Sequence, residues 1–242
     1  KKCRAFSMAV LQTDGVWKQR MAKRGSAFFF FLKAFARYVD HELKYVHAVS
    51  HSLMGQWRWL PGYAILLKAF IITMKARRIQ TFSDALVNCA GSLLTNGVLL
   101  TVFMKVMFFR TNVYRQEAVL HALQYVHYFM EWILRRERRM PNTFDFEFLM
   151  HSLSILIESE ICRNPYHALW FIYNNSAIFI GGGKHKAEAD GRALMAYKRL
   201  FHRLLTGHFD TLMFHWASFV RDKFCQVLLF RVVNLANPEM IL

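Results

Sequence analysis

The sequence predicts an all-α protein of about eight helices joined by short turns. Apolar residues recur at helical spacing (i, i+3, i+4, i+7) in one segment after another. The composition agrees, since 55% of the residues are hydrophobic, 16% are aromatic and only 4 of 242 are proline, which excludes a disordered chain. Strands are not predicted, because β-branched residues are sparse and no Asn-Gly pair lies between two alternating runs.

A short internal repeat bears on how the helices are arranged. The tetrapeptide Leu-Lys-Ala-Phe occurs at 32–35 and again at 67–70, thirty-five residues apart. Helix-pair repeats have periods of about 34 to 47 residues. We therefore expect an irregular helical-repeat segment, an α-solenoid of the HEAT or armadillo kind. A globular helical bundle is the alternative.

Three helices are expected in the first part of the chain. The first, 26–53, keeps helical spacing until a Trp-Arg-Trp-Leu-Pro-Gly break. The second, 63–78, ends in a cationic turn, as the helix dipole favours. The third, 84–109, follows a capping serine or threonine, and its Asn-Gly pair at 96–97 marks a place where it kinks or divides.

Four more helices follow in the middle of the chain. A Thr-Asn pair precedes the first of them, and the Asn-Pro pair at 164–165 gives the third an N-cap followed by proline at the first helical position. The predicted helices are 113–139, 144–162, 166–180 and 192–207.

The last predicted helix is the longest and runs from Gly207 to Asn-Pro at 237–238. Its apolar stripe keeps helical spacing, and its second half is apolar on nearly every side. We therefore expect this helix to be buried against the other helices of a larger helical assembly. The predicted core residues here, together with one from an earlier helix, are Trp216, Phe219, Val220, Phe224 and Trp170.

Changes in composition along the chain suggest its organisation. Residues 1–25 form a basic lead-in, and residues 26–180 form the helical array. The glycine-rich, polar stretch 181–191 is a linker. Residues 192–242 form a C-terminal helical pair in the same domain. Because the chain starts without methionine and is apolar to its last residue, we expect a fragment of a longer protein.

Charge and cysteine usage restrict the partners and the compartment. The formal net charge of +16 suits an acidic partner, which could be nucleic acid, an anionic membrane surface or an acidic subunit. The four cysteines (Cys3, Cys89, Cys162 and Cys225) are scattered without paired spacing. They indicate reduced core thiols rather than a disulfide framework or a zinc site. We expect an intracellular protein in a reducing compartment, cytoplasmic in the first instance, with an organelle as the alternative.

Two patterns approach known ligand sites without completing them. Gly181-Gly182-Gly183-Lys184 is not a P-loop, because Ile178 stands where the first glycine is needed and His185 where the serine or threonine is needed. His47 and His51 share a helix face at ligand spacing, but the glutamate of a zinc-protease motif and a third ligand are missing. The sequence therefore predicts neither a metal nor another cofactor.

A catalytic set is also missing. The sequence contains no Gly-x-Ser-x-Gly motif, the cysteines lack an evident histidine partner, and the acidic residues are few and dispersed. Asp145 and Glu147 open a helix, where the helix dipole explains them. We predict that the chain is not an enzyme.

The candidate binding residues are cationic clusters. The densest has four arginines in five residues, and arginine suits bidentate contact with carboxylate or phosphate. The alternative interpretation is that these clusters are solvent-exposed charges at the C-termini of helices. The predicted partner-binding residues are Arg135, Arg136, Arg138 and Arg139, with Lys75, Arg77 and Arg78 as a second cluster and Lys184, His185 and Lys186 as a third.

One segment has the length of a membrane span. Residues 85–104 carry no formal charge for twenty positions, the length that a bilayer requires. The segment also contains Asn88, Ser92 and Asn96, so it is only moderately apolar. A buried core helix is the preferred interpretation, and a membrane anchor through 85–109 is the alternative.

Two passages, residues 167–175 and residues 212–232, contain the patterns Leu-Trp-x-x-Tyr-Asn and His-Trp-Ala-x-x-Val-Arg. They resemble a family of large eukaryotic proteins known only for a domain of unknown function. In that family, a Leu-Trp-x-x-Tyr-Asn segment precedes a helix carrying His-Trp-Ser-x-x-Val-Arg. This chain has Ala217 in place of the serine of the second motif. The resemblance implies a helical module of a large eukaryotic protein and implies no catalytic residues. The matching positions are Leu169, Trp170, Tyr173, Asn174, His215, Trp216, Val220 and Arg221.

These observations lead to one functional hypothesis and two alternatives. The first is a non-catalytic helical scaffold of a larger protein or complex, whose partners are other protein subunits or an anionic membrane surface met by its basic face. The second is a membrane-associated subunit anchored through 85–109. The third is an RNA-contacting subunit of a ribonucleoprotein, which is less favoured because the aromatic residues have core spacing rather than lying beside the charge.

Overall fold

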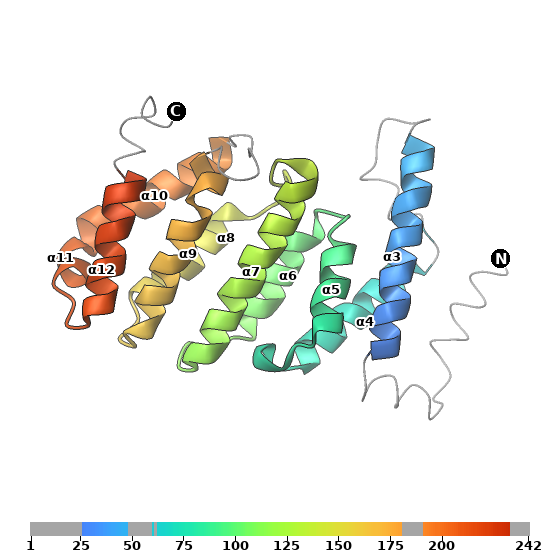
Figure 1. The fold of residues 1–242 in the computed structure, drawn as a ribbon, viewed down its shortest axis with the longest axis horizontal. Helices are drawn as coiled ribbons and strands as arrows, with labels where there is room; N and C mark the ends of the chain where they lie inside the picture. The colour runs from blue at the N-terminus through green and yellow to red at the C-terminus, as the bar shows by residue number, and fades with distance from the viewer. Residues whose placement is uncertain (1–25, 48–59, 61, 181–190, 233–242) are drawn as a thin grey trace. The chain divides into compact units, whose positions relative to one another are not determined.

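The computed structural model describes residues 26–47, 60, 62–180 and 191–232, and this part of the chain is helical without strands (Figure 1). The all-α class is confirmed, with ten α-helices in the described residues where about eight were expected. The α-solenoid arrangement stays a prediction. The basic lead-in, the third cationic cluster with its glycine-rich linker, His51 and the Asn-Pro pair at 237–238 lie outside the described residues.

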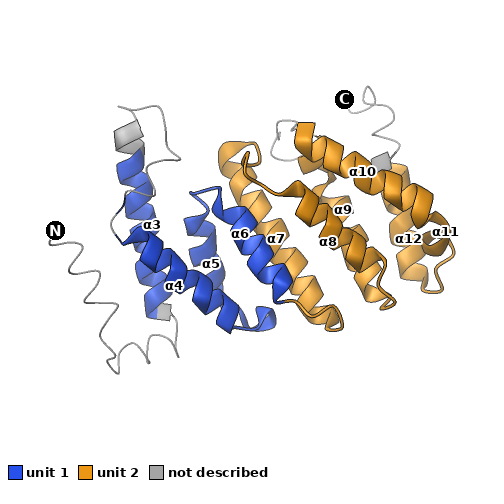
Figure 2. Cartoon of the chain, turned by 180° about the vertical axis from the view of Figure 1, so that it is seen from behind, with its two compact units in different colours: residues 1–110 blue, residues 111–242 orange. Residues whose placement is uncertain are grey.

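The chain divides into two compact units, residues 1–110 and residues 111–242 (Figure 2). The division falls at Arg110 and Thr111, in the turn after the last helix of unit 1. The predicted organisation, with 26–180 as one helical array, stays a prediction. Each unit has its own buried apolar residues.

In unit 1, helices pack against the helix two places further along the chain. Helix α3 packs against α5, and α4 packs against α6. Aromatic rings join them: Phe29 meets Phe70 edge to face, and Phe70 is tilted against Phe103, with ring centroids 6.0 and 5.6 Å apart. The helices of the unit are α3 (Ser26–His47), α4 (Tyr63–Ala76), η2 (Ile79–Thr81), α5 (Asp84–Leu93) and α6 (Leu99–Phe109).

The predicted helix 84–109 is divided at its Asn-Gly pair, one of the two expected outcomes. Ser83 caps α5 by accepting a hydrogen bond from the Leu86 amide at 3.4 Å. In the break, Asn96 donates its side-chain amide to the Tyr63 hydroxyl at 3.1 Å. The two resulting helices have 10 and 11 residues. Among the described residues, none of the helices combines the length and the hydropathy that a membrane span requires.

Unit 2 is organised around α9, which packs against α7, α8, α10 and α12 (Figure 1). Its inward residues Leu169, Phe171 and Ile172 are completely buried. The helices of the unit are α7 (Gln116–Glu137), α8 (Phe146–Ile157), α9 (Arg163–Ile180), α10 (Gly191–Gly207), α11 (Phe209–Met213) and α12 (Ser218–Val227), followed by the short π-helical η3 (Leu228–Val232).

The single long helix predicted from Gly207 onward is wrong. The structure has α11, a turn at 214–217, α12 and η3 in its place. Apolar spacing alone does not reveal the turn, because the turn is held by polar contacts of His215 and Arg221 with its backbone.

The turn at 214–217 changes which apolar residues of this segment are buried. Trp216 is 76% exposed and Phe219 is 39% exposed, so their predicted core positions are wrong. Val220 and Phe224 belong to α12 itself and are fully buried. Trp170 is only partly buried and packs edge to face on the His127 ring, with centroids 5.9 Å apart.

Candidate functional site

The arginine cluster lies at the C-terminal end of α7 and in the turn that follows. Arg135 and Arg136 are in the last helical turn. Arg138 ends the helix in the left-handed region with a φ of 55°, and its amide donates to the Leu134 carbonyl. All four arginines of the cluster are exposed, so this end of α7 is a strongly cationic surface.

The four arginines differ in what holds them. Arg135 pairs with Glu131 one turn back, with Nη2 to Oε2 at 2.8 Å. The Arg136 guanidinium lies over the Trp132 ring, 5.9 Å from its centroid. The side chains of Arg138 and Arg139 are exposed and make no hydrogen bond or close ion pair with a described residue, although Arg139 interacts electrostatically with the Glu137 carboxyl group.

A chain of polar contacts runs from α9 through His127, in the middle of α7, to the first arginine of the cluster. Asn175 is buried and donates its amide to the Phe171 carbonyl, which leaves its oxygen as acceptor. His127 therefore donates from Nδ1 to that oxygen at 2.8 Å. The other ring nitrogen of His127 lies 3.8 Å from Oε1 of Glu131, the carboxylate that pairs with Arg135. Sequence reasoning missed this link, because His127 and Asn175 are 48 residues apart.

Helix α10 adds cations to the same unit. Arg192, in its first turn, donates to the backbone carbonyl of Asn142, three residues beyond the arginine cluster. Its guanidinium also lies over the Phe146 ring, 5.9 Å from the centroid. We define the basic surface of unit 2 as Arg135, Arg136, Arg138, Arg139 and Arg192.

The second predicted cluster lies elsewhere. Lys75 is in the last turn of α4, and Arg77 and Arg78 come directly after the end of this helix. All three residues belong to unit 1. Arg77 is over the Phe29 ring, 5.4 Å from the centroid, and so takes part in packing. Lys75 and Arg78 are exposed and make no close ion pair among the described residues.

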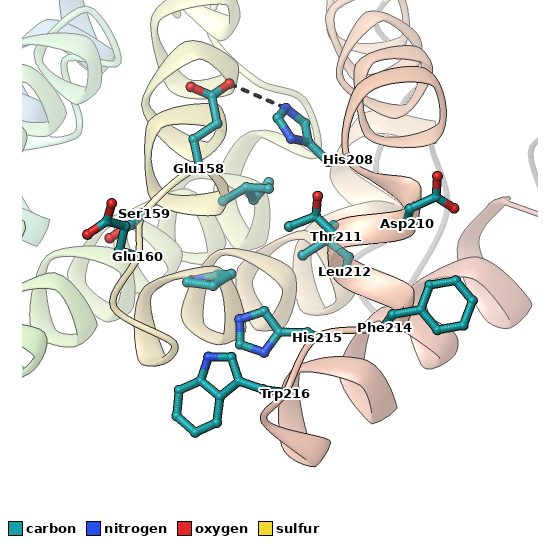
Figure 3. A pocket seen from close by; sticks show the side chains of 12 residues that line it. Glu158, Ser159, Glu160, His208, Asp210, Thr211, Leu212, Phe214, His215 and Trp216 are labelled. Carbon is teal, nitrogen blue, oxygen red and sulfur yellow. Dashed lines mark ion pairs between the residues drawn. The ribbon is translucent and has the colours of Figure 1, made fainter.

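Unit 2 also has an open pocket of about 730 Å³ that the sequence did not predict (Figure 3). One wall is the turn between α8 and α9, with Glu158 and Glu160, and the other is α11 with the residues around it. Glu158 points across to His208, with Oε1 to Nε2 at 3.4 Å. His215 and Trp216 lie below this pair in Figure 3. The pocket joins residues fifty positions apart, which no local sequence pattern could show.

The turn at 214–217 forms one edge of this pocket. The amide of Ala217 donates to Nδ1 of His215 at 3.1 Å, so the proton of the neutral ring is on Nε2. Arg221 donates to the carbonyls of His215 and Trp216, at 2.6 and 3.3 Å. The His215 and Trp216 rings stack with centroids 5.6 Å apart. These contacts hold the indole in place while leaving it exposed.

The three described cysteines differ in burial. Cys89 is fully buried, and this burial raises the pKa of its thiol to about 12, so the thiolate is not formed at neutral pH. Cys162 and Cys225 are partly exposed free thiols. In the described residues, no three His, Cys, Asp or Glu side chains gather as a metal site would require.

The fold and the two surfaces define an all-α protein with a cationic helix end and a separate acidic, aromatic pocket. The chain belongs to a family described as "Protein of unknown function (DUF1765)", whose match covers residues 100–232, more than half of the chain. The resemblance to a domain of unknown function is thereby confirmed. No curated protein matches the chain. Solved structures give no match either.

Proposed function

We propose that this chain is a non-catalytic helical module of a larger eukaryotic protein or complex, and that it binds acidic segments of partner proteins. The observation that carries the proposal is the basic surface of unit 2, where four exposed arginines at the end of α7 are joined by Arg192 of α10.

Helix electrostatics explain only part of this surface. The partial negative charge at a helix C-terminus stabilises Arg135 and Arg136 in the last turn of α7. It does not explain Arg138 and Arg139, which lie beyond the last helical residue. Arg192 is in the first turn of α10, where the helix dipole disfavours a cation. Contacts with the Asn142 carbonyl and the Phe146 ring hold Arg192 within the fold. The exposed guanidinium groups of Arg138 and Arg139 are therefore the part of the surface that an anionic partner explains better than helix stability does.

Carboxylate groups of a protein are the favoured partner. Arginine presents a planar set of donors that binds carboxylates in a bidentate way. Single-stranded RNA binding would add exposed aromatic rings on which bases stack. The aromatic residue within this surface, Trp132, is half-buried below Arg136. Arg135 is paired with Glu131, which also contacts His127, and this pairing restricts the Arg135 side chain. The side chain therefore loses less entropy when a partner binds.

The test compares two charge reversals of equal size on the full chain. The site variant is Arg138→Glu with Arg139→Glu, and the control is Lys75→Glu with Arg78→Glu. All four residues are exposed and lack a close ion pair among the described residues, so both variants should fold. Binding of a fluorescent peptide of alternating Glu and Gly is measured by anisotropy over a range of salt concentrations, because screening weakens contacts between exposed charges.

We expect the site variant to bind the acidic peptide about tenfold more weakly and with a shallower salt dependence, and the control to change affinity less than about threefold. Equal losses in the two variants would mean that net charge alone attracts the peptide, and the proposal would be wrong. Two further probes are an oligouridylate and vesicles rich in phosphatidylserine. If the site variant loses binding to either of these while the acidic peptide never binds, the partner is not an acidic protein.

A further inference from the structure

Helix α10 has an outer face on which every charged side chain is cationic. Together with its neighbour α8, this helix lies at the back of unit 2 in Figure 1 and at the front in Figure 2. Its sequence contains no Asp or Glu, and its residues Tyr197, Leu200 and Leu204 are buried. We define the α10 face by its exposed residues Arg192, Met195, Lys198, Arg199, His202 and Arg203.

Helix stability does not explain this concentration of positive charge. Arg199 and Arg203 are four positions apart, so two like charges are neighbours on the helix surface, which disfavours the helix. The contacts to α8 compensate for one of them: Nη1 of Arg199 pairs with Oε1 of Glu147 at 2.6 Å. Arg203 meets only a neutral group there, the Ser154 hydroxyl at 3.3 Å. An anionic partner would supply carboxylates that α10 itself lacks.

Met195 is an apolar residue at the centre of this cationic face. It follows Arg192 by three positions and precedes Arg199 by four, which are the spacings at which side chains are neighbours on a helix. Its side chain is 53% exposed, although α10 has a buried side that takes up most of its other apolar residues. Methionine is flexible and adapts to apolar groups of different shapes, as binding surfaces require. The α10 face therefore combines cations with one exposed apolar contact.

We propose that the α10 face docks an acidic segment of a partner protein in which a large apolar side chain lies between the acidic residues. The apolar side chain packs on Met195, and the carboxylates on either side of it bind the surrounding cations. The proposal rests on the function proposed for the basic surface of unit 2, with which the α10 face shares Arg192, and it specifies the partner: a run of carboxylates alone binds less tightly than one with an apolar residue.

The side chains of the α10 face favour a protein segment over RNA or a lipid surface. Both aromatic residues of α10, Tyr197 and Phe201, are buried, so the face has no ring on which a base could stack. The apolar side of α10 packs within unit 2, whereas a helix that binds a bilayer inserts its apolar side. From Arg192 to Arg203 the face is about 16 Å long at about 1.5 Å per residue. About five residues of an extended segment, at about 3.3 Å each, cover this length.

The test uses the full chain and two labelled peptides. One is the alternating Glu and Gly peptide, and the other differs only in having leucine in place of a central glycine. The site variants are Met195→Ala and Lys198→Glu. Their matched controls are Ile72→Ala and Lys75→Glu on α4, because Ile72 is 56% exposed and Lys75 is also exposed. Affinity is measured by anisotropy, and contact with Met195 is followed by methionine methyl signals in NMR spectra.

We expect the leucine peptide to bind about fivefold more tightly than the glycine peptide, because its apolar side chain leaves water. Met195→Ala removes most of this gain and keeps the affinity of the glycine peptide within about twofold. Lys198→Glu weakens both peptides about fivefold, while the two controls change neither affinity by more than about twofold. The methyl signal that is missing in Met195→Ala shifts when the leucine peptide binds.

Three results would overturn the proposal. They are equal affinities of the two peptides, a leucine gain that Met195→Ala leaves intact, and binding that Lys198→Glu does not weaken. If the Arg138→Glu, Arg139→Glu variant still weakens both peptides in such a case, the function proposed for the basic surface stands without the α10 face.

The opposite pattern separates the two proposals in the other direction. If Lys198→Glu weakens binding and the Arg138→Glu, Arg139→Glu variant does not, the α10 face is the docking site and its placement at the end of α7 is wrong. If neither peptide binds, both proposals are wrong. If vesicles rich in phosphatidylserine then bind, and Lys198→Glu weakens this binding, the partner of the α10 face is a lipid surface.

Discussion

The division of the last predicted helix makes a sharp prediction about two aromatic residues only eight positions apart. We consider Trp216→Ala in the turn and Phe224→Ala in α12. Phe224 is fully buried and meets the Phe209 ring edge to face, with centroids 5.9 Å apart. Removing a buried Phe side chain costs about 3 to 5 kcal/mol of unfolding free energy, because burial is lost and a cavity is left.

Trp216 gives a much smaller number. With 76% of its surface exposed, roughly a quarter is buried. A quarter of about 250 Å² at about 25 cal/mol per Å² gives an upper value of about 1.5 kcal/mol for Trp216→Ala. The larger side chain of the two should therefore have the smaller effect.

Urea unfolding of the full chain, followed by far-UV circular dichroism, measures both variants. Because the dependence of unfolding free energy on urea should stay the same, the shift in midpoint gives the change in stability. A cost for Trp216→Ala equal to or above that for Phe224→Ala would refute the reasoning. That result would place the indole in a core, as one continuous helix from Gly207 would require.

Three further predictions concern buried polar groups. Asn164 is fully buried, and its side-chain amide donates two hydrogen bonds at 2.9 Å, one to the segment before α7 and one to the α8–α9 turn. Asn164→Ala should therefore lower the free energy of unfolding in urea by about 1 to 3 kcal/mol. A change near zero would mean that these hydrogen bonds do not stabilise the fold. Burial lowers the pKa of His167 below its usual 6.5, so stability is complete above about pH 6.5 and falls as pH drops toward the lower folded pKa. His167→Gln should remove this slope, and an unchanged pH profile would assign the slope to other groups. Cys89, with a thiol pKa of about 12, should stay unlabelled by a thiol reagent in the native protein and react only on unfolding; rapid native labelling would contradict its burial.

Local sequence signals predicted much of the helical structure. Apolar spacing and caps indicated the helices up to residue 207, and the Asn-Gly pair at 96–97 indicated the division between α5 and α6. These features depend on neighbouring residues, which periodicity and capping rules describe. The arginine cluster was also visible, because its members are adjacent in sequence.

The features that sequence reasoning missed depend on contacts between distant residues or on polar contacts with the backbone. The turn at 214–217 replaces helical hydrogen bonds with contacts from the side chains of His215 and Arg221, while the apolar stripe continues through it. The pocket requires the turn after α8 to face α11, and its one ion pair joins Glu158 to His208. The two residues of such a contact are far apart in the sequence, so no local pattern connects them.

The most direct test of the central claim is a hydrogen-exchange footprint of the full chain with and without the acidic peptide. Bound peptide should slow exchange at the end of α7 and the turn after it, residues 131–142, and in the first turns of α10, residues 191–199. The first of these ranges should lose its protection in the Arg138→Glu, Arg139→Glu variant. Protection found instead at the cationic end of α4, residues 75–81, or at the pocket, residues 208–216, would contradict the claim that the basic surface of unit 2 is the binding site.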